Sequence, residues 1–316
     1  MQQETLRIIF FGTPGFAVPS LSALLDSRHP VVGLVSQPDR PKGRGQKLVA
    51  TPTKEVALAR GVSVLQPIKL RDEEFLRAVE ALAPDLGVVA AYGRILPDRL
   101  LQIPRLGMIN VHASLLPKYR GAAPVHRAVI DGEQETGVTI MRVVAALDAG
   151  PTFACIRRPI GPGDTSVEVE RDLARLGAGL LLEIVDAIAQ GRATEVPQDD
   201  AQATYAAKIE KDEGIADWTL PAARLHNLVR GLQPWPLVSA SFGDVRTRIH
   251  RTAVSDDRTS AEPGRVASAS GGVIRVACGD GRLLDVLELQ PEGRRAMTAR
   301  EFLAGHRIEP GTRLGP

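Results

Sequence analysis

The sequence has few of the residues that mark metal-binding, secreted or membrane proteins. Its two cysteines, Cys155 and Cys278, are isolated and share no metal-ligand spacing, which argues against a zinc site and fits a reducing compartment. No stretch approaches the roughly 20 apolar residues that a membrane helix needs. The apolar run at residues 8–11 ends at Gly12, well short of the core of a signal peptide. We therefore expect a cytoplasmic protein with no membrane partner.

A strong excess of charge of either sign is also missing. The formal net charge is +2 at pH 7, so any contact with nucleic acid must come from local clusters of cations. Hydrophobic residues make up 44% of the chain and charged residues 24%, which is typical of a globular protein and excludes a disordered or fibrous one. At 316 residues, the chain is long enough for two domains of roughly 150 residues each.

The first half of the chain alternates short apolar runs with amphipathic segments, which is the rhythm of βαβ units. The runs are apolar throughout, as strands of a sheet covered on both faces require. They span residues 6–11, 31–35, 62–65, 86–91 and 108–111. Residues 137–144 alternate between apolar and polar residues more than these runs do. They predict a strand that makes the far edge of the sheet antiparallel.

A long helix closes this part of the chain. It is predicted over residues 165–190, with Thr165 or Asp164 as its N-cap, Glu168 as its third residue and Gly191 at its end. We predict an α/β domain over residues 1–190 with a Rossmann-like, open and mostly parallel sheet.

The remainder predicts a linker and a second, smaller domain. Residues 191–206 are polar, small and without period, as expected of a linker. Residues 207–316 contain a helix near 221–231 and then short strands divided by Gly-rich turns. These strands span residues 237–242, 245–254, 264–268, 272–278 and 283–290. Such spacing suggests a small barrel or sandwich, and we predict an OB-like β-barrel.

The strongest candidate site lies at the end of the strand near residue 110. Asn110 and His112 are two apart, so their side chains should project together at the carboxyl end of a parallel strand, where open α/β sheets bind ligands. Either residue alone is more often structural, because both commonly satisfy nearby backbone groups.

An acidic residue follows the next predicted strand. Asp148 precedes Gly150 closely, and an Asp followed by Gly usually marks a turn. An acid near His112 would, however, fix the tautomer of the imidazole and stabilise its protonated form.

Four motifs together give the chain a family resemblance. They are Asn110-Val111-His112, Ser114-Leu115-Leu116-Pro117, Tyr119-Arg120-Gly121-Ala122-Ala123-Pro124 and Asp148-Ala149-Gly150. In order and interval they resemble those of the folate-dependent formyltransferases, and the likeness runs nearly end to end. The resemblance implies transfer of the formyl group of 10-formyltetrahydrofolate to the free amine of methionyl-initiator tRNA. We expect a monomer, and the chemistry needs no metal.

The resemblance also implies the catalytic residues. Asn110, His112 and Asp148 would form the catalytic trio. Asn110 and a protonated His112 would donate hydrogen bonds to the tetrahedral oxyanion, and Asp148 would keep His112 charged. Two segments would hold the folate, and their residues are Ser114, Leu115, Leu116 and Pro117, with Tyr92, Gly93, Arg94, Ile95 and Leu96.

Two groups of cations are candidates for tRNA contacts. The loop at residues 37–48 carries Arg40, Lys42, Arg44 and Lys47, with no acid from Arg40 until Glu55. Such a run is usually a solvated loop. Because it follows the second strand, however, it overlooks the same crevice, and in the resembling family it grips the tRNA end.

The second group lies in the predicted second domain. Arg246 and Arg248 alternate there, so one face of a predicted strand is cationic, although an ordinary solvent-facing strand explains the spacing equally well. Trp218 and Trp235 are interpreted as core and corner anchors rather than stacking platforms.

Three other interpretations fit the sequence less well. The turn at residues 12–15 lacks the full spacing of a dinucleotide-binding motif, so we assign it to strand-to-helix packing. A formyltransferase acting on an amino-sugar nucleotide shares the trio, but it does not need the cations of the 37–48 loop. A non-catalytic folate- or RNA-binding module predicts loss of a trio member, and all three are present.

Overall fold

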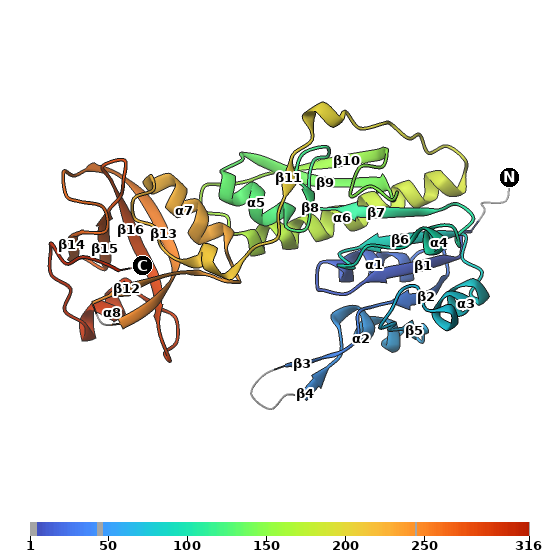
Figure 1. Cartoon of the computed structure of the whole chain (residues 1–316), viewed down its shortest axis with the longest axis horizontal. Coiled ribbons are helices and arrows are strands. Elements are labelled where there is room, and N and C mark those ends of the chain that lie inside the picture. Colours follow the sequence, from blue (N-terminus) through green and yellow to red (C-terminus); the bar gives the residue numbers. More distant parts are fainter. Residues whose placement is uncertain (1–4, 43–46, 244, 316) are drawn as a thin grey trace. The chain divides into compact units, whose positions relative to one another are not determined.

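A computed structural model describes residues 5–42, 47–243 and 245–315 of the chain. The chain divides into two compact units (Figure 1). The first comprises Met1–Pro124, Thr136–Arg158 and Glu170–Ala206, and the second comprises Val125–Glu135, Pro159–Val169 and Ala207–Pro316. Among the described residues, no helix is long and apolar enough to cross a membrane.

The described part of the first unit is built on a sheet of seven strands. The strand order is β10-β9-β7-β6-β1-β2-β5. The bounds are β1 (Ile8–Gly12), β2 (Val31–Val35), β5 (Val64–Leu65), β6 (Leu86–Ala90), β7 (Met108–His112), β9 (Glu135–Arg142) and β10 (Thr152–Pro159). The strands from β5 to β7 in this order are parallel, and β9 runs antiparallel to β7. The open, mostly parallel sheet with an antiparallel far edge is therefore confirmed.

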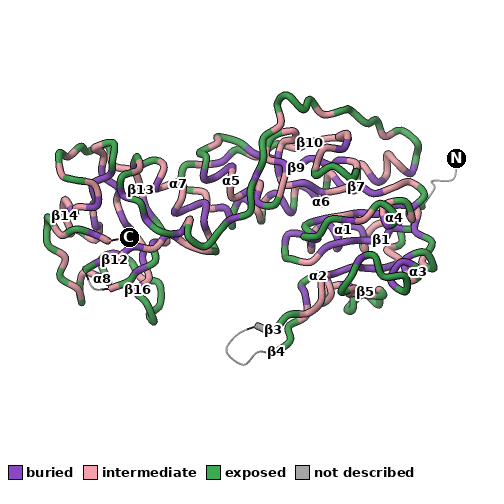
Figure 2. Tube along the Cα trace, viewed as in Figure 1, coloured by how far each residue is buried: buried purple, intermediate pink, exposed green. Residues whose placement is uncertain are grey.

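Apolar residues on both faces of the sheet explain why it needs helices on each side. All five residues of β1 are buried, and Figure 2 shows burial concentrated along the central strands. Ile9 and Phe11 pack in one core cluster with Phe75 and Val79 of the helix at Glu73–Ala81. Full burial of each such side chain contributes roughly 1.5–3 kcal/mol.

Helices connect the strands of this sheet. Their bounds are α1 (Ala17–Leu25), α2 (Pro52–Ala59), α3 (Glu73–Ala81), α4 (Asp98–Leu101), α5 (Pro124–Asp131) and α6 (Ser166–Ala189). At the start of α6, the Thr165 N–H donates to Glu168 at 2.9 Å and the Glu168 N–H donates to the Thr165 hydroxyl at 3.3 Å. This reciprocal capping confirms the predicted helix start, with Thr165 as the cap.

Close packing at the end of β1 confirms the interpretation of the 12–15 turn. A Cβ added to Gly12 would lie 2.8 Å from the Cβ of Ala17, in α1, and 2.9 Å from the carbonyl oxygen of Ala90, in β6. Only glycine lets the chain pass so near both neighbours. The turn therefore serves the packing of strand against helix.

The described part of the second unit from Ala207 onward forms a curved antiparallel sheet with two α-helices. Its described strands are ordered β12-β13-β16-β15-β14, and β17 pairs with β16. The bounds are β12 (Val238–Phe242), β13 (Val245–Arg258), β14 (Val266–Ser270), β15 (Val273–Ala277), β16 (Arg282–Pro291), β17 (Met297–Thr298), α7 (Ala222–Gly231) and α8 (Ala299–Gly305). Register shifts between β13 and β16 let these long strands curve, as a small barrel-like domain requires. The predicted fold class is confirmed.

Two segments differ from the sequence-based expectations. The basic loop contains an antiparallel hairpin, β3 (Arg40–Lys42) and β4 (Lys47–Val49), which extends from the body of the first unit (Figure 1). The segment at 191–206 is not a free connection. It contains η1 (Asp200–Gln202) and β11 (Tyr205–Ala206), and β11 pairs with β8 (Arg120–Gly121). A short 3-10 turn, η2 (Lys211–Gly214), follows in the second unit.

Candidate functional site

The candidate site is built around the carboxyl end of β7, which carries Asn110 and His112. His112 is 5% exposed and Asn110 is half-buried. Within the described part of the chain, the Asn110 carboxamide has no hydrogen-bond partner. Its two N–H donors are therefore available to a ligand.

The two ring nitrogens of His112 face different acceptors. Nε2 lies 3.0 Å from the carbonyl oxygen of Tyr119, and because a carbonyl can only accept, this bond requires a proton on Nε2. Nδ1 lies 3.7 Å from Oδ2 of Asp148, which is longer than a hydrogen bond. A doubly protonated ring would therefore face an acceptor at each nitrogen. Because the carboxylate is beyond hydrogen-bond distance, the Nδ1 N–H could still donate to a ligand.

Both partners of His112 come from strained backbone. Tyr119 has a φ of 59° and Asp148 a φ of 48°, in the left-handed region that side chains other than glycine rarely adopt. The Gly121 N–H donates to Oδ2 of Asp148 at 2.9 Å and holds the carboxylate toward the imidazole. Such strain persists where surrounding contacts enforce it, and it is concentrated at functional sites.

Gln198, from the segment predicted as a linker, holds the turn that carries Asp148. Its Nε2 donates to the carbonyl oxygens of Asp148 and Gly150, at 2.8 and 2.7 Å. Its Oε1 accepts from the buried Arg120 at 2.8 Å, and Arg120 also donates to Asp200 at 2.7 Å. Sequence reasoning missed Gln198, because a single polar residue in an aperiodic segment gives no local signal.

The loop after His112 is shaped by hydroxyl groups. Thr139 accepts from the Leu116 N–H at 3.1 Å and donates to the Ser114 carbonyl at 2.7 Å. The buried Ser114 hydroxyl donates to the carbonyl of Lys118 at 2.6 Å. Ser114 therefore shapes the loop through its side chain, while Leu115, Leu116 and Pro117 are half-buried and present apolar surface. Thr139 was not predicted.

The loop at residues 91–97 is part core and part surface. Tyr92 is 1% exposed, its ring packs edge-on against Phe11 at 5.7 Å, and burial raises the pKa of its hydroxyl. Leu96 is also buried. Gly93, Arg94 and Ile95 are exposed, Ile95 to 82%.

A second exposed isoleucine lies on a neighbouring loop. Ile68 is 79% exposed, and Arg94 donates to its carbonyl oxygen at 2.8 Å. Arg94 thus joins the loops that carry Ile68 and Ile95. Exposed aliphatic side chains of this kind suit an apolar face of a ligand. Ile68 was not predicted, because its exposure depends on the arrangement of two loops.

The cations of the basic hairpin are only partly described. Arg40 is exposed and donates to Oε1 of Gln37 at 3.0 Å. Lys42 and Lys47 lie on β3 and β4, but their side chains are outside the described part of the chain, and Arg44 lies wholly outside it.

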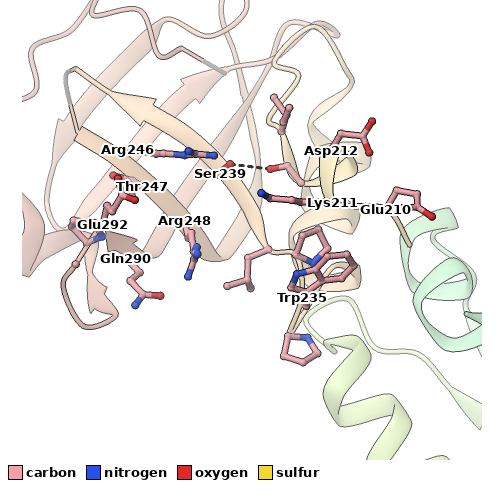
Figure 3. Close-up of a pocket in the computed structure, with 17 residues that line it drawn as sticks. Glu210, Lys211, Asp212, Trp235, Ser239, Arg246, Thr247, Arg248, Gln290 and Glu292 are labelled. Atoms are coloured by element: carbon pink, nitrogen blue, oxygen red, sulfur yellow. Dashed lines mark hydrogen bonds between the residues drawn. The ribbon is translucent and has the colours of Figure 1, made fainter. Parts of the chain in front are cut away.

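The second unit contains a groove with a cavity volume of about 860 Å³ (Figure 3). Arg246 and Arg248, on β13, line it and are exposed, and they lie opposite Ser241 and Ser239 of β12. In the part of the chain that the structure describes, neither guanidinium has a hydrogen-bond or ion-pair partner. Lys211 reaches into the groove between these arginines and Trp235, as Figure 3 shows.

The two tryptophans differ in exposure. Trp218 is 6% exposed, so its interpretation as a core residue is confirmed. Trp235 is 52% exposed and lines the groove, so it is not a core residue. It lies between Pro234 and Pro236 on the connection from α7 to β12, outside any strand that would bury it.

Acidic side chains lie toward the margins of this groove. Glu210 and Asp212 point away from its centre on one side, and Glu292 lies on the other (Figure 3). The centre therefore presents cations and one indole. Phosphate and a flat ring are the ligand groups that match these side chains.

Comparison with known proteins gives consistent matches over both units. Residues 6–185 match the family model described as formyl transferase, and residues 208–307 match the formyl transferase C-terminal domain. The chain is 46% identical over 310 residues to the methionyl-tRNA formyltransferase of Trichlorobacter lovleyi, covering 98% of this chain and 97% of that one. It is 44% identical to the protein of the same name from Moorella thermoacetica, over 98% and 99% of the two chains.

A solved structure shares the fold at much lower identity. It is an N-formyltransferase from Helicobacter canadensis in complex with folinic acid and dTDP-3-aminofucose. The TM-score is 0.68 at 16% identity, covering 91% of this chain and 100% of that one. At this identity the likeness extends to the fold alone.

Proposed function

The chain belongs to the formyltransferase family, and from this premise we propose that it is the enzyme that formylates methionyl-initiator tRNA. The formyl donor is 10-formyltetrahydrofolate, and the protein acts as a monomer in the cytoplasm. The observation that carries the proposal is the approach of Asp148 to His112 at the end of the strand that also carries Asn110, in a chain whose relatives of that name match it over 98% of its length.

The reaction joins the methionyl nitrogen to the formyl carbon. Attack by the amine forms a C–N bond and turns the formyl oxygen into an oxyanion. Collapse breaks the bond to N10 of the folate, and one proton passes from the attacking amine to that nitrogen. A site that accelerates this reaction must stabilise the oxyanion and move the proton.

The trio supplies both needs. Asn110 donates from its free carboxamide to the oxyanion. Because Nε2 of His112 is bonded to Tyr119, Nδ1 is the ring nitrogen that donates to the oxyanion or carries the proton. Oδ2 of Asp148 lies 3.7 Å from Nδ1, so the carboxylate balances the charge of the imidazolium without forming a hydrogen bond to its N–H.

The donor binds along the loops at the same edge of the sheet. Leu115, Leu116 and Pro117 supply apolar contact from one loop, and Gly93, Arg94 and Ile95 present the exposed surface of the other. Tyr92, Leu96 and Ser114 hold the loops in place from the interior. Ile68 adds to the apolar surface beside Ile95.

The acceptor tRNA binds through cations on both units. Arg40, Lys42, Arg44 and Lys47 of the basic hairpin meet phosphates of the acceptor end, and Arg246 and Arg248 meet the tRNA body. In this proposal residues 1–190 form the catalytic domain, residues 191–206 the connection and residues 207–316 the tRNA-binding domain. Gln198 gives the connection a further role, because it supports the turn of Asp148.

One assay tests the proposal. The protein is incubated with donor labelled in its formyl group and with methionyl-initiator tRNA, and the methionine amine is then tested for blocking. Labelled N-formylmethionyl-tRNA is the expected product. Amino-sugar nucleotides serve as competing acceptors, and preferential labelling of one of them would overturn the assignment of the acceptor.

A further inference from the structure

Three turns that follow parallel strands of the first unit are joined by side-chain hydrogen bonds. Gln37 follows β2, Gln66 follows β5, and the 91–97 loop follows β6. Because these strands are parallel, their carboxyl ends lie at one edge of the sheet. The first turn leads into the basic hairpin, and the third belongs to the proposed donor site.

The bonds form a closed circuit. Nε2 of Gln37 donates to the Tyr92 carbonyl at 2.7 Å, and Nε2 of Gln66 donates to the Gln37 carbonyl at 2.8 Å. Arg94 completes the circuit, since it donates to the carbonyls of the two residues after Gln66 at 3.1 and 2.8 Å. Each turn is therefore held by the other two.

The same circuit holds both ends of the basic hairpin. Arg40, the first residue of β3, donates to Oε1 of Gln37 at 3.0 Å. Asp39 accepts from Gln66 at 2.7 Å and from Lys54, which follows β4, at 2.6 Å. The hydrogen bond from the Lys54 ammonium, with that from Gln66, holds the pKa of the Asp39 carboxyl below its ordinary value. The hairpin thus leaves the sheet in a fixed direction.

The amide of Gln37 contacts both the hairpin and the donor loop directly. Its Oε1 receives Arg40 and its Nε2 binds the Tyr92 carbonyl, so one planar group bonds to both segments. The fit is tight on the donor side. Gly93 has a φ of 77°, and a Cβ there would lie 2.8 Å from Nε2 of Gln37. A shift of the donor loop therefore displaces the amide that holds the hairpin.

We propose that Gln37 is a positioning residue that couples binding of the folate donor to binding of the tRNA acceptor. The inference rests on the proposed function, because it takes the 91–97 loop as donor site and the hairpin as acceptor site. A donor that orders its loop fixes the amide and with it the hairpin. By thermodynamic linkage, each substrate then raises the affinity for the other by the same factor.

The coupling is measured without turnover. Tetrahydrofolate carries no formyl group, so it and methionyl-tRNA form a stable ternary complex. The Kd of methionyl-tRNA is measured with and without saturating tetrahydrofolate, and the Kd of tetrahydrofolate with and without methionyl-tRNA. For each substrate, the ratio of the Kd without the other substrate to the Kd with it measures the coupling. In the wild-type protein, the two ratios should be equal and lie in the range of about 5 to 150 that is typical of coupled sites.

Two variants separate the bonds of the amide. Gln37→Leu keeps the size of the side chain but removes both bonds, and it should bring the ratio close to 1. Gln37→Glu keeps the acceptor for Arg40 but places a carboxylate oxygen against the Tyr92 carbonyl, so it should uncouple the sites as well. Gln190→Leu is the matched control, because this exposed glutamine bonds to Arg192 on the same unit, away from the circuit.

The outcomes are distinct. A wild-type Kd ratio of 1 would overturn the proposed coupling. A wild-type ratio that is retained in both Gln37 variants would overturn the role of Gln37 in it. If Gln37→Leu does not fold, Gln37→Glu decides the question. If the wild-type protein forms no N-formylmethionyl-tRNA, the proposed function fails, and this is established before any ratio is compared.

Discussion

His112 and Asp148 face each other at 3.7 Å, too far for a hydrogen bond and close enough for strong electrostatic attraction once the imidazole is protonated. Nε2 of the same ring is bonded to the Tyr119 carbonyl, so Nδ1 is the ring nitrogen left for a ligand. If Nδ1 also carries a proton, the carboxylate attracts it without forming a hydrogen bond to it.

Removing any member of the trio should therefore affect chemistry more than binding. Asn110→Ala and His112→Ala each delete an oxyanion donor, and kcat should fall by about 10² to 10³. Asp148→Asn, which keeps the size of the side chain, should also lower kcat because it removes the charge beside Nδ1. Steady-state formylation of methionyl-tRNA measures the effect, and the Kd of tetrahydrofolate should change little.

The control for these variants is His306→Ala. This histidine stacks on Phe302 in the second unit and has no role in the proposed chemistry. Near-normal turnover of all three trio variants would contradict the catalytic assignment.

Gln198 should influence catalysis although it lies outside the trio. Gln198→Leu removes two hydrogen bonds that hold the left-handed turn of Asp148. A displacement of the carboxylate should lower kcat by roughly tenfold, which corresponds to about 1.4 kcal/mol in the activation barrier. The KM for the donor should stay near its original value. Gln202→Leu is the matched control, since Gln202 donates to Asp199 in the same segment. Equal kcat values for the two variants would show that the turn holds without Gln198.

Local patterns made the strands and the central pair of site residues predictable. Continuous apolar runs predict buried parallel strands, and a two-residue spacing places Asn110 and His112 on one face whatever surrounds them. The capping residues Thr165 and Glu168 act within one turn of helix, so the start of α6 was also predictable.

Contacts between distant segments were not predictable in the same way. Gln198 reaches a turn 50 residues earlier in the chain, and no periodicity marks such a contact. The β3–β4 hairpin was interpreted as a loop because prolines, glycines and cations hide its short strands. The exposure of Trp235 depends on the path of the chain after α7 rather than on the hydrophobicity of the indole.

The pair of Asp186 and His29 should make the stability of the first unit depend on pH. The Nε2 of His29 lies 3.0 Å from Asp186, and this hydrogen bond, with that from Arg28, holds the pKa of the Asp186 carboxyl below its ordinary value. A lowered folded-state pKa stabilises the fold at pH values above the ordinary carboxyl range, and the effect is lost as the pH falls through the lowered value.

Asp186→Asn should therefore destabilise the protein by about 1 kcal/mol at pH 7, a modest figure because the carboxylate is partly exposed and screened. The difference from wild type should shrink toward zero near about pH 3. Urea unfolding at the two pH values measures it. Asp256→Asn, at an exposed carboxylate, is the control, and an equal loss at both pH values would rule out the charge as the cause.

The groove of the second unit should contribute to tRNA binding through two adjacent phosphates and one stacked ring. Arg246 and Arg248 are two apart on β13, which separates them by about 6.7 Å along the strand, close to the separation of consecutive phosphates in a nucleic-acid strand. Trp235 lines the same groove and offers an exposed face for a base or ribose.

Replacing both arginines by alanine should raise the KM for methionyl-tRNA and make log Kd less salt-dependent, by a slope of about 0.7 to 0.9 per lost phosphate contact. Trp235→Ala should weaken binding by about 1–3 kcal/mol, with little change in the salt slope, because stacking is not a charge interaction. In both cases kcat at saturating tRNA should persist, since none of these side chains belongs to the proposed catalytic trio. Arg307→Ala, at an exposed arginine paired with Glu309 on the same unit, is the control. An unchanged salt slope in the double arginine variant would exclude the two arginines as phosphate contacts. If the double variant changes the slope but Trp235→Ala leaves the affinity unchanged, the tRNA contacts the β13 side of the groove and not the indole.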